Sequence, residues 1–199
     1  MTEARLRAVF LDRDGVLNAL VPDPATGLPE SPNRVEDLQL LPGVASALRT
    51  LRAAGYLLVC VTNQPAAAKG KTSVAELQAI QARLVTLLEG DGARIDLLEI
   101  CLHHPDGIVP ELSGPCECRK PAPGMLVRAA SHLGVDLRQS WMVGDSESDV
   151  EAGRLAGCRT ILVTHPDSRH RRGEETAADA VVSDLVGAAS LLSDQEVDC

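Results

Sequence analysis

Short apolar runs, separated by longer amphipathic or polar stretches, set the pattern of this 199-residue chain. Brief uninterrupted apolar runs are typical of strands buried on both faces of a sheet. They predict strands at residues 8–11, 57–61, 95–102, 141–143, 160–163 and 180–182. Between them, apolar spacing of three to four residues, bounded by proline, serine or glycine, predicts helices. These helices cover residues 42–54, 73–88, 123–132, 146–156 and 185–192.

Strand and helix alternate along the whole chain, an order that predicts an α/β fold with a Rossmann-like, doubly wound parallel sheet. In such sheets, ligands bind beyond the carboxyl ends of the strands. Asp12, Thr62 and Asp145 each lie just after a predicted strand, so we expect them near one another. Three stretches rich in proline, glycine and polar residues predict loops, the last of them exposed. They are residues 19–37, 103–121 and 165–179.

Ser73 is followed three residues later by Glu76, which predicts a capping box at the start of its helix. The helix that it opens carries its apolar residues on one face, which we expect to pack on the sheet.

Composition refines this picture. Apolar residues make up 45% of the chain but aromatic residues only 2%, so the core must be aliphatic, which suits a parallel sheet covered by helices. The net charge of -9 argues against a nucleic-acid partner. No apolar run approaches the roughly 18 residues of a membrane span, and charged Glu3, Arg5 and Arg7 do not fit a signal peptide. We therefore expect a cytoplasmic monomer, folded as one domain over residues 1–199, without a membrane partner.

Six cysteines require an explanation in a chain expected in a reducing compartment. Cys60 lies in an apolar run and is predicted to be a buried, inert thiol. We assign no role to Cys158 or Cys199. The remaining three thiols and a neighbouring imidazole fall in one polar loop, and this donor set is typical of a closed, tetrahedral zinc site. They are Cys101, His103, Cys116 and Cys118, with His104 as the rival nitrogen ligand and thiols without a metal as the alternative.

The carboxylates of Asp12 and Asp14 follow a buried strand, where their charge requires a cation or hydrogen bonds. Alone, this pattern also fits a surface turn. Three further segments favour phosphate chemistry. Thr62 offers a hydroxyl donor and Lys120 an ammonium group, while Asp145 offers the hard oxygen ligands that Mg²⁺ prefers.

Taken in chain order, the segments Asp12–Gly15, Thr62, Lys120–Pro121 and Gly144–Asp149 resemble the four motifs of the haloacid dehalogenase superfamily. The resemblance implies that Asp12 attacks phosphorus and that Asp14 protonates the leaving oxygen and then activates water. It implies Mg²⁺ held by Asp12, the backbone carbonyl of Asp14 and Asp145. Thr62 and Lys120 would stabilise the transferring phosphoryl group.

Asp149 would orient Lys120 or a metal-bound water, with a solvated acid at a helix start as the alternative.

The region around Cys101, His103, Cys116 and Cys118 resembles bacterial heptose 1,7-bisphosphate phosphatases, and so does Thr62-Asn63-Gln64. That resemblance implies a zinc loop at about residues 101–118 in place of a large cap domain. It also implies that Asn63, Gln64 and Arg119 bind substrate. Arg119 would hold the distal phosphate with its two-pronged guanidinium; the alternative is an arginine that only covers the zinc loop.

The chain differs from this family at Pro65, Lys69 and Ser146, in the segments that hold substrate. The resemblance implies removal of the 7-phosphate of D-glycero-D-manno-heptose 1,7-bisphosphate, a small phosphorylated sugar. Histidinol phosphate or another small phosphate monoester is the alternative substrate. A catalytically silent, zinc-bearing interaction domain is the non-enzymatic alternative.

Overall fold

A computed structural model describes residues 6–24, 26–173 and 175–194 of the chain. Glu3, Arg5 and Cys199 lie outside the described residues. Six parallel strands form the main sheet in the order β5-β4-β1-β6-β7-β8. They are β1 (Ala8–Leu11), β4 (Leu57–Asn63), β5 (Leu97–Cys101), β6 (Trp141–Gly144), β7 (Arg159–Val163) and β8 (Ala180–Val182). All six predicted strands are therefore present.

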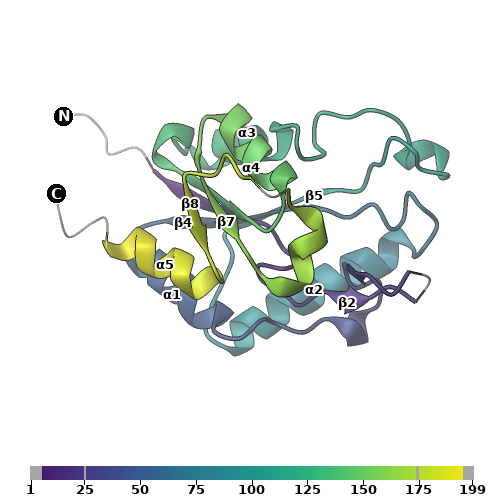
Figure 1. Cartoon of the computed structure of the whole chain (residues 1–199), viewed down its shortest axis with the longest axis horizontal. Coiled ribbons are helices and arrows are strands. Elements are labelled where there is room, and N and C mark those ends of the chain that lie inside the picture. The colour runs from purple at the N-terminus through teal and green to yellow at the C-terminus, as the bar shows by residue number, and fades with distance from the viewer. Residues whose placement is uncertain (1–5, 25, 174, 195–199) are drawn as a thin grey trace.

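Five α-helices cover the two faces of this sheet (Figure 1). They are α1 (Val44–Ala53), α2 (Val74–Gly90), α3 (Gly124–Leu133), α4 (Glu147–Ala156) and α5 (Leu185–Asp194). The helices α1, α2 and α5 pack on one face, and α3 and α4 pack on the other. The predicted doubly wound α/β fold is confirmed, and no large cap domain is present among the described residues.

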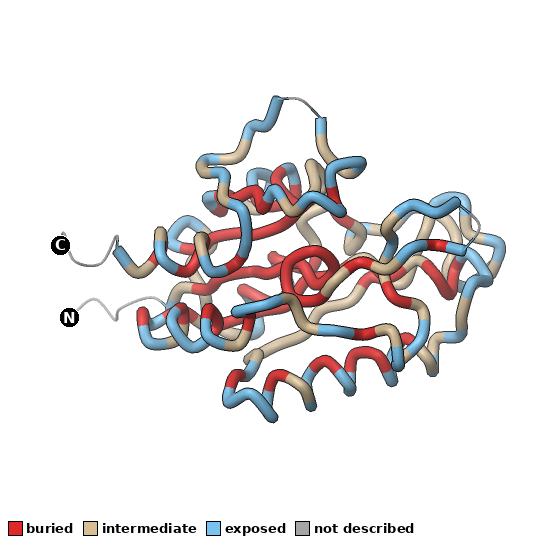
Figure 2. The backbone as a smooth tube through the Cα atoms, turned by 60° about the horizontal axis from the view of Figure 1, so that its bottom comes forward, coloured by how far each residue is buried: buried red, intermediate tan, exposed pale blue. Residues whose placement is uncertain are grey.

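Side chains of each strand alternate between two separate apolar cores, because successive residues of a strand point to opposite faces. In β1, Val9 and Leu11 pack against α1, α2 and α5, whereas Ala8 and Phe10 pack against α3 and α4. Figure 2 shows the buried strands as a continuous layer inside the molecule. Because β1 is buried on both faces, the chain that leaves its carboxyl end begins in a nearly water-free environment.

All three predicted loops contain more structure than the sequence indicated. Residues 19–37 form the antiparallel hairpin of β2 (Val21–Pro22) and β3 (Pro29–Glu30), followed by the 3₁₀ helix η1 (Val35–Asp37). The stretch 165–179 was expected to be exposed throughout, but it contains the 3₁₀ helix η4 (Pro166–Arg171), and Ser168 within it is fully buried. Two shorter 3₁₀ helices complete the fold, η2 (Pro110–Leu112) and η3 (Leu137–Gln139).

Ser73 caps α2 as predicted, because its side chain accepts a hydrogen bond from the backbone N–H of Glu76. The carboxylate of Glu76 accepts the backbone N–H of Val35 at 3.0 Å and so ties α2 to η1. A full capping box forms instead at α4, between Ser146 and Asp149. No helix in the described ranges is both long enough and apolar enough to cross a membrane.

Trp141 opens β6 and is 2% exposed. Its ring packs in the core beneath α1, α2 and α5, and the guanidinium of Arg159 stacks on it at 3.9 Å from the ring centroid. Asp145 follows the opposite end of the same strand. The aromatic ring therefore lies at the amino edge of the sheet, away from the edge that carries the predicted site.

Candidate active site

The carboxyl ends of β1, β4 and β6 bring Asp12, Thr62 and Asp145 together, as predicted. The strands β1 and β6 are neighbours, and the backbone N–H of Asp12 donates to the carbonyl of Val143 at 2.9 Å. Asp12 is 7% exposed and Asp145 is fully buried. Two carboxylates in such a position require cationic partners, because burying an unpaired charge is costly.

Lys120 supplies one of these charges, from a segment more than one hundred residues away in sequence. Its ammonium lies 2.7 Å from Asp12 Oδ1, 2.7 Å from the carbonyl of Val61 and 2.6 Å from Asp149 Oδ1. Three acceptors therefore surround a group that has three protons to donate. Asp149 is 1% exposed, so it is not the solvated helix-start acid considered as its alternative.

Asn63 fixes the backbone that carries Lys120. Its side-chain amide donates to the carbonyl of Lys120 at 3.0 Å and accepts the backbone N–H of Lys120 at 3.1 Å. Asn63 also lines the cavity described below. Asn63 therefore holds the lysine in place, and its predicted contact with substrate stays a prediction.

Burial raises the pKa of Asp12 from 3.8 to about 6, although the Lys120 charge opposes this shift. Lys120 is itself buried, but the charges of Asp12 and Asp149 outweigh burial and raise the pKa of its ammonium above the ordinary value. The lysine therefore remains charged, and it compensates two buried carboxylates at once.

A closed network holds Asp14. Its carboxylate accepts hydrogen bonds from Arg13, from Asn18 at 3.0 Å and from Gln64 at 2.6 Å. Burial alone would raise the pKa of Asp14, but the Arg13 guanidinium and the two amide donors outweigh it and lower the pKa below 3.8. Asp14 is therefore an ionised, oriented carboxylate beside Asp12.

Gln64 differs from its predicted role. We expected it to bind substrate, but it is 1% exposed and its amide nitrogen donates to Asp14 Oδ2 and to the hydroxyl oxygen of Thr62, at 2.8 Å. Its carbonyl oxygen accepts a hydrogen bond from Arg13 at 2.8 Å. Since the Thr62 oxygen accepts from Gln64, this contact does not use the hydroxyl proton of Thr62.

Asp145 has the surroundings expected of a metal ligand. Neither of its carboxylate oxygens has a hydrogen-bond partner among the described residues. Oxygens of Asp12, Asp145 and Asp149 lie within 4.8 Å of one another. Burial and the Asp12 charge raise the pKa of Asp145 well above 3.8. This cluster of buried carboxylate oxygens fits a hard divalent cation such as Mg²⁺.

Gly15 makes room for Asp145. A Cβ atom at this position would lie 2.0 Å from Asp145 Oδ2, and the backbone has a φ of +89°. Only glycine adopts such a φ without strain and also admits a carboxylate so close to the backbone. Gly15 is therefore required for Asp145 to approach the backbone next to Asp14.

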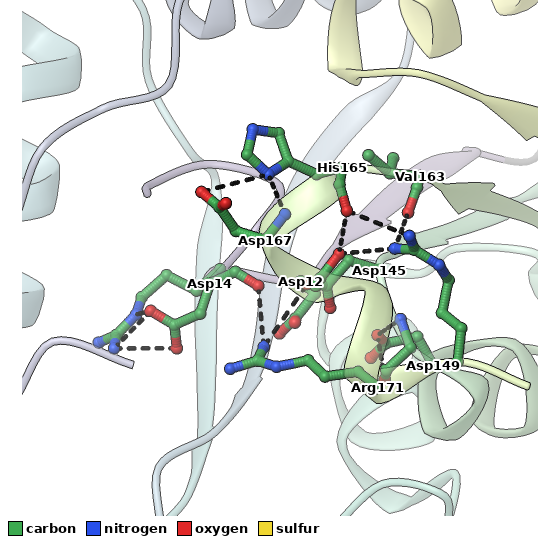
Figure 3. Close-up of polar contacts among 12 residues, drawn as sticks. Asp12, Asp14, Asp145, Asp149, Val163, His165, Asp167 and Arg171 are labelled. Atoms are coloured by element: carbon green, nitrogen blue, oxygen red, sulfur yellow. Dashed lines mark hydrogen bonds and ion pairs between the residues drawn. The ribbon is translucent and has the colours of Figure 1, made fainter. Parts of the chain in front are cut away.

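Arg171, a residue that the sequence did not indicate, reaches the same place from η4. Its Nη1 lies 3.3 Å from the backbone carbonyl of Asp14 and 3.5 Å from Asp145 Oδ2. Figure 3 shows its side chain directed toward these two residues. Desolvation lowers the pKa of the guanidinium, but the charges of Asp145, Asp12 and Asp14 outweigh it and raise this pKa.

A cavity of about 330 Å³ opens above these side chains. Asp12, Asp14, Lys120 and Asp149 form part of its lining, and three further cationic residues from separate segments line it as well. These three are Lys69, Arg119 and Arg171. Glu30, at the end of the β2–β3 hairpin, and the next residue Ser31 line another side of the cavity. The sequence predicted only a loop in this stretch.

A larger cavity of about 950 Å³ shares Glu30 and Ser31 with the first. Its lining contains none of the predicted catalytic residues and includes several carboxylates. The smaller cavity is the candidate active site, because the reactive groups and the cations converge there.

The four predicted zinc ligands meet in one cluster beside this cavity. The Sγ of Cys118 lies 3.1 Å from that of Cys101, 3.4 Å from that of Cys116 and 3.4 Å from His103 Nδ1. Around zinc with bonds of about 2.3 Å, tetrahedral geometry places sulfur ligands roughly 3.8 Å apart. The cluster is close to that size, and its separations are too long for a disulfide.

The neighbours of the cluster agree with the preferred ligand set. His104 Nδ1 accepts the backbone N–H of Asp106 at 3.1 Å and is outside the cluster. Arg119 lines the cavity, and its guanidinium also donates to the carbonyl of His103 at 3.3 Å. One side chain therefore covers the cluster and also borders the cavity, and its binding of the distal phosphate stays a prediction.

Comparison with known proteins agrees with this geometry. A family model described as HAD-hydrolase-like matches residues 117–188. A D-glycero-beta-D-manno-heptose-1,7-bisphosphate 7-phosphatase of Rhodopseudomonas palustris is 41% identical over 153 residues, which are 77% of this chain and 81% of that protein. A relative from Photorhabdus laumondii, named for the alpha anomer, is 36% identical over 84% of this chain and 89% of its own.

Among solved structures, the D,D-heptose 1,7-bisphosphate phosphatase of B. bronchiseptica, in complex with magnesium and phosphate, superposes with a TM-score of 0.80. It is 32% identical, and the match covers 96% of this chain and 99% of that one.

Proposed function

Given that the chain belongs to the haloacid-dehalogenase-like family of heptose-1,7-bisphosphate 7-phosphatases, we propose that it is a Mg²⁺-dependent phosphatase that removes the 7-phosphate of D-glycero-D-manno-heptose 1,7-bisphosphate. The observation that carries this proposal is the convergence of Asp12, Lys120 and Asp145, from three distant segments, at one cavity. Lys120 lies 2.7 Å from Asp12, which fits a nucleophile held next to a phosphate-binding charge.

In the proposed reaction, a carboxylate oxygen of Asp12 attacks phosphorus, the bond to the sugar oxygen breaks and an aspartyl phosphate forms. Asp14 must first take up a proton from solvent, because its carboxylate is ionised in the free site. It gives this proton to the leaving sugar oxygen and later takes one back from the water that hydrolyses the aspartyl phosphate. The network of Arg13, Asn18 and Gln64 fixes the position of Asp14 for both transfers. It also favours the ionised form, which the second transfer needs.

Lys120 and the hydroxyl proton of Thr62 would stabilise the charge that develops on the phosphoryl oxygens. Mg²⁺, when bound, neutralises charge between the nucleophile and the phosphate, and Asp12, Asp145 and the carbonyl of Asp14 would hold it. Asp149 would keep Lys120 in place through the 2.6 Å contact.

Arg119 would bind the phosphate that is not transferred. It borders the cavity and presents a guanidinium, which can hold two phosphate oxygens at once. The carbonyl of His103 anchors it to the thiolate cluster, so the proposed zinc site would position this arginine. We assign Zn²⁺ a structural role, since four protein ligands leave no open coordination position.

Phosphate release from the heptose bisphosphate by the wild-type chain and by Asp12→Asn tests the mechanism. We expect the variant to lose turnover at least a thousandfold and to keep its fold, because the amide is not a nucleophile. Asp91→Asn changes an exposed carboxylate far from the cavity and serves as the control. Retained activity in Asp12→Asn would refute the proposed nucleophile.

Substrate choice is tested by comparing kcat/KM for the alpha and beta anomers of heptose bisphosphate with kcat/KM for histidinol phosphate. Relatives are named for both anomers, so both belong in the assay. A preference for histidinol phosphate would overturn the substrate assignment and leave the phosphatase chemistry intact. Failure to hydrolyse any sugar phosphate would favour the zinc-bearing interaction domain.

Metal analysis of protein purified without added metal tests the zinc site. We expect about one zinc per chain, and Cys116→Ser should release it, because a closed site needs all four ligands. Cys158→Ser, which removes a thiol outside the cluster, is the control. A zinc-free wild-type protein would contradict the assignment.

The organisation proposed for the chain is one domain over residues 1–199, with the zinc loop inserted at about residues 101–118, acting as a monomer in the cytoplasm. The five described cysteines form no disulfide, which is compatible with a reducing compartment. Size-exclusion chromatography with light scattering tests the monomer.

A further inference from the structure

Hydrogen bonds of the neighbouring residues fix the backbone position of Arg171. Arg172, the next residue, donates hydrogen bonds to the carbonyl of Val163 at 3.3 Å, to Ser168 Oγ at 2.6 Å and to the carbonyl of His165 at 3.1 Å. Ser168 is fully buried and donates its hydroxyl to the carbonyl of His165 at 3.0 Å. These contacts hold η4 against the end of β7, and Figure 3 shows Val163 and His165, whose carbonyls accept them, in the same view as the carboxylates.

Arg171 uses oxygens that the proposed function assigns to Mg²⁺. Its Nη1 lies 3.3 Å from the carbonyl of Asp14 and 3.5 Å from Asp145 Oδ2. Two of the three proposed metal ligands therefore share one guanidinium nitrogen. Asp145 is fully buried and the Arg171 side chain is 20% exposed, so the two charges attract each other with little screening by water.

A divalent cation and a guanidinium compete for these oxygens, because two cations this close repel each other in a buried site. Mg²⁺ bound there would therefore weaken the hold of Asp14 and Asp145 on the guanidinium. Arg172 keeps the segment in place, and Arg171 lines the cavity, so the released side chain stays next to the metal. The released guanidinium would then meet a phosphoryl group bound in the cavity that Arg171 and Asp12 line.

We propose that Arg171 is a phosphate-binding residue that Mg²⁺ switches on: the cation displaces the guanidinium from the carbonyl of Asp14 and from Asp145, and the guanidinium then binds the phosphoryl group that is transferred. The inference rests on the proposed phosphatase function. It adds a second cation to Lys120 at the cavity that both residues line, so that two positive charges would hold the phosphoryl group. Arginine suits this position, because its planar fork holds two oxygens of one phosphate.

Two binding constants of the full-length, zinc-loaded chain test the proposal. The first is the Kd for Mg²⁺ alone, measured by calorimetry without substrate. Arg171→Met keeps the aliphatic stem and removes the charge that competes with Mg²⁺ for the oxygens of Asp14 and Asp145. Mg²⁺ should therefore bind about tenfold more tightly to this variant. Arg171→Lys keeps the charge but not the fork, and its Kd should stay within about threefold of the wild-type value.

The second constant is the inhibition constant of inorganic phosphate at saturating Mg²⁺. It should rise about tenfold in Arg171→Met and partly recover in Arg171→Lys, since only a residue that contacts the anion depends on charge and fork. Arg169→Ala removes an equal charge from the same segment and should change neither constant. In the part of the chain that the structure describes, Arg169 donates to the carbonyls of Arg172 and Gly173 and makes no hydrogen bond or ion pair with the carboxylates of the site.

Tighter Mg²⁺ binding together with weaker phosphate inhibition in Arg171→Met supports the proposal. A wild-type value of either constant in that variant overturns it, and so does an equal effect of Arg169→Ala. A wild-type chain that binds Mg²⁺ and phosphate but does not hydrolyse heptose bisphosphate would overturn only the substrate assignment. A wild-type chain that binds neither would overturn the proposed function and this inference with it.

Discussion

Replacing Lys120 by methionine tests whether one buried ammonium compensates two carboxylates. Methionine has a similar length and no charge, so the change removes the partner of Asp12 and Asp149 without leaving a large void. Lys120 is 3% exposed, and its ammonium lies within 2.7 Å of both carboxylates. Water cannot readily take its place.

The expected loss follows from these contacts. Removing one partner of a buried ion pair costs about 3–5 kcal/mol. Asp12 can relieve part of this cost by taking up a proton, because burial already raises its pKa to about 6 with Lys120 in place. We therefore expect Lys120→Met to lower the free energy of unfolding by about 3 kcal/mol. For a chain of this size, such a change lowers Tm by roughly 6–12 °C.

The stability difference between the wild type and Lys120→Met should increase with pH. The pKa of Asp12 is higher in the folded chain than its ordinary value of 3.8, so its contribution to stability falls as pH rises toward about 6. Without Lys120 this pKa rises further, and the variant continues to lose stability above pH 6, where the wild type no longer does. The difference between the two proteins should therefore be larger at pH 8 than at pH 6.

Urea unfolding followed by far-UV circular dichroism at both pH values, without added Mg²⁺, measures these differences. Lys69→Met removes an exposed lysine from the same cavity and should change stability by less than about 0.5 kcal/mol. Combining Lys120→Met with Asp149→Asn should cost less than the sum of the single changes, by about 1–3 kcal/mol. A Lys120→Met protein as stable as the wild type at pH 8 would refute the compensation argument.

Three further predictions concern other residues of the site. Gly15→Ala places a methyl group against Asp145 and strains a positive φ, so stability should fall by at least about 1 kcal/mol and the Mg²⁺ concentration for half-maximal activity should rise about tenfold. Gln64→Met should lower kcat about 10–100-fold with KM within twofold, since its amide positions Asp14 and not the substrate. Burial raises the pKa of Cys60 to about 12, so mass spectrometry should find it unmodified by iodoacetamide at pH 8 until the protein is unfolded in urea.

Each of these has a matched control. Gly134 also has a positive φ but open space around its Cβ position, so Gly134→Ala should lose stability without changing the Mg²⁺ requirement. Gln81→Met alters another buried glutamine and should leave kcat unchanged. An unchanged Mg²⁺ requirement in Gly15→Ala, a raised KM in Gln64→Met, or rapid native alkylation of Cys60 would each contradict the corresponding argument.

Much of the fold follows from the sequence, because buried parallel strands leave a strong signal. Each predicted strand is present, and Ser73 caps its helix as expected. The β2–β3 hairpin left no such signal, since strands of two residues are too short to show a period. The burial of Ser168 in η4 was equally hidden, because it depends on contacts with His165 and Arg172 that form only in the folded chain.

The site shows the same division. Asp12, Thr62 and Asp145 could be placed because the carboxyl ends of parallel strands share one edge of the sheet. The roles of Gln64 and Arg171 depend on the direction of a side chain, which the spacing of residues does not give. Arg13 did leave a usable signal, since a charged residue that follows a buried strand needs a partner, and it finds one in Asp14.

Trp141, the only tryptophan of the chain, gives the protein a built-in fluorescent probe. Its indole is 2% exposed in an aliphatic core, so native emission should lie at short wavelength and shift to the red when the core opens to water. Asp145 lies four residues further along, roughly 13 Å away at strand spacing. Tryptophan emission should therefore change when the core unfolds but hardly change when metal or phosphate binds at the opposite edge of the sheet. A single titration can then distinguish unfolding from ligand binding.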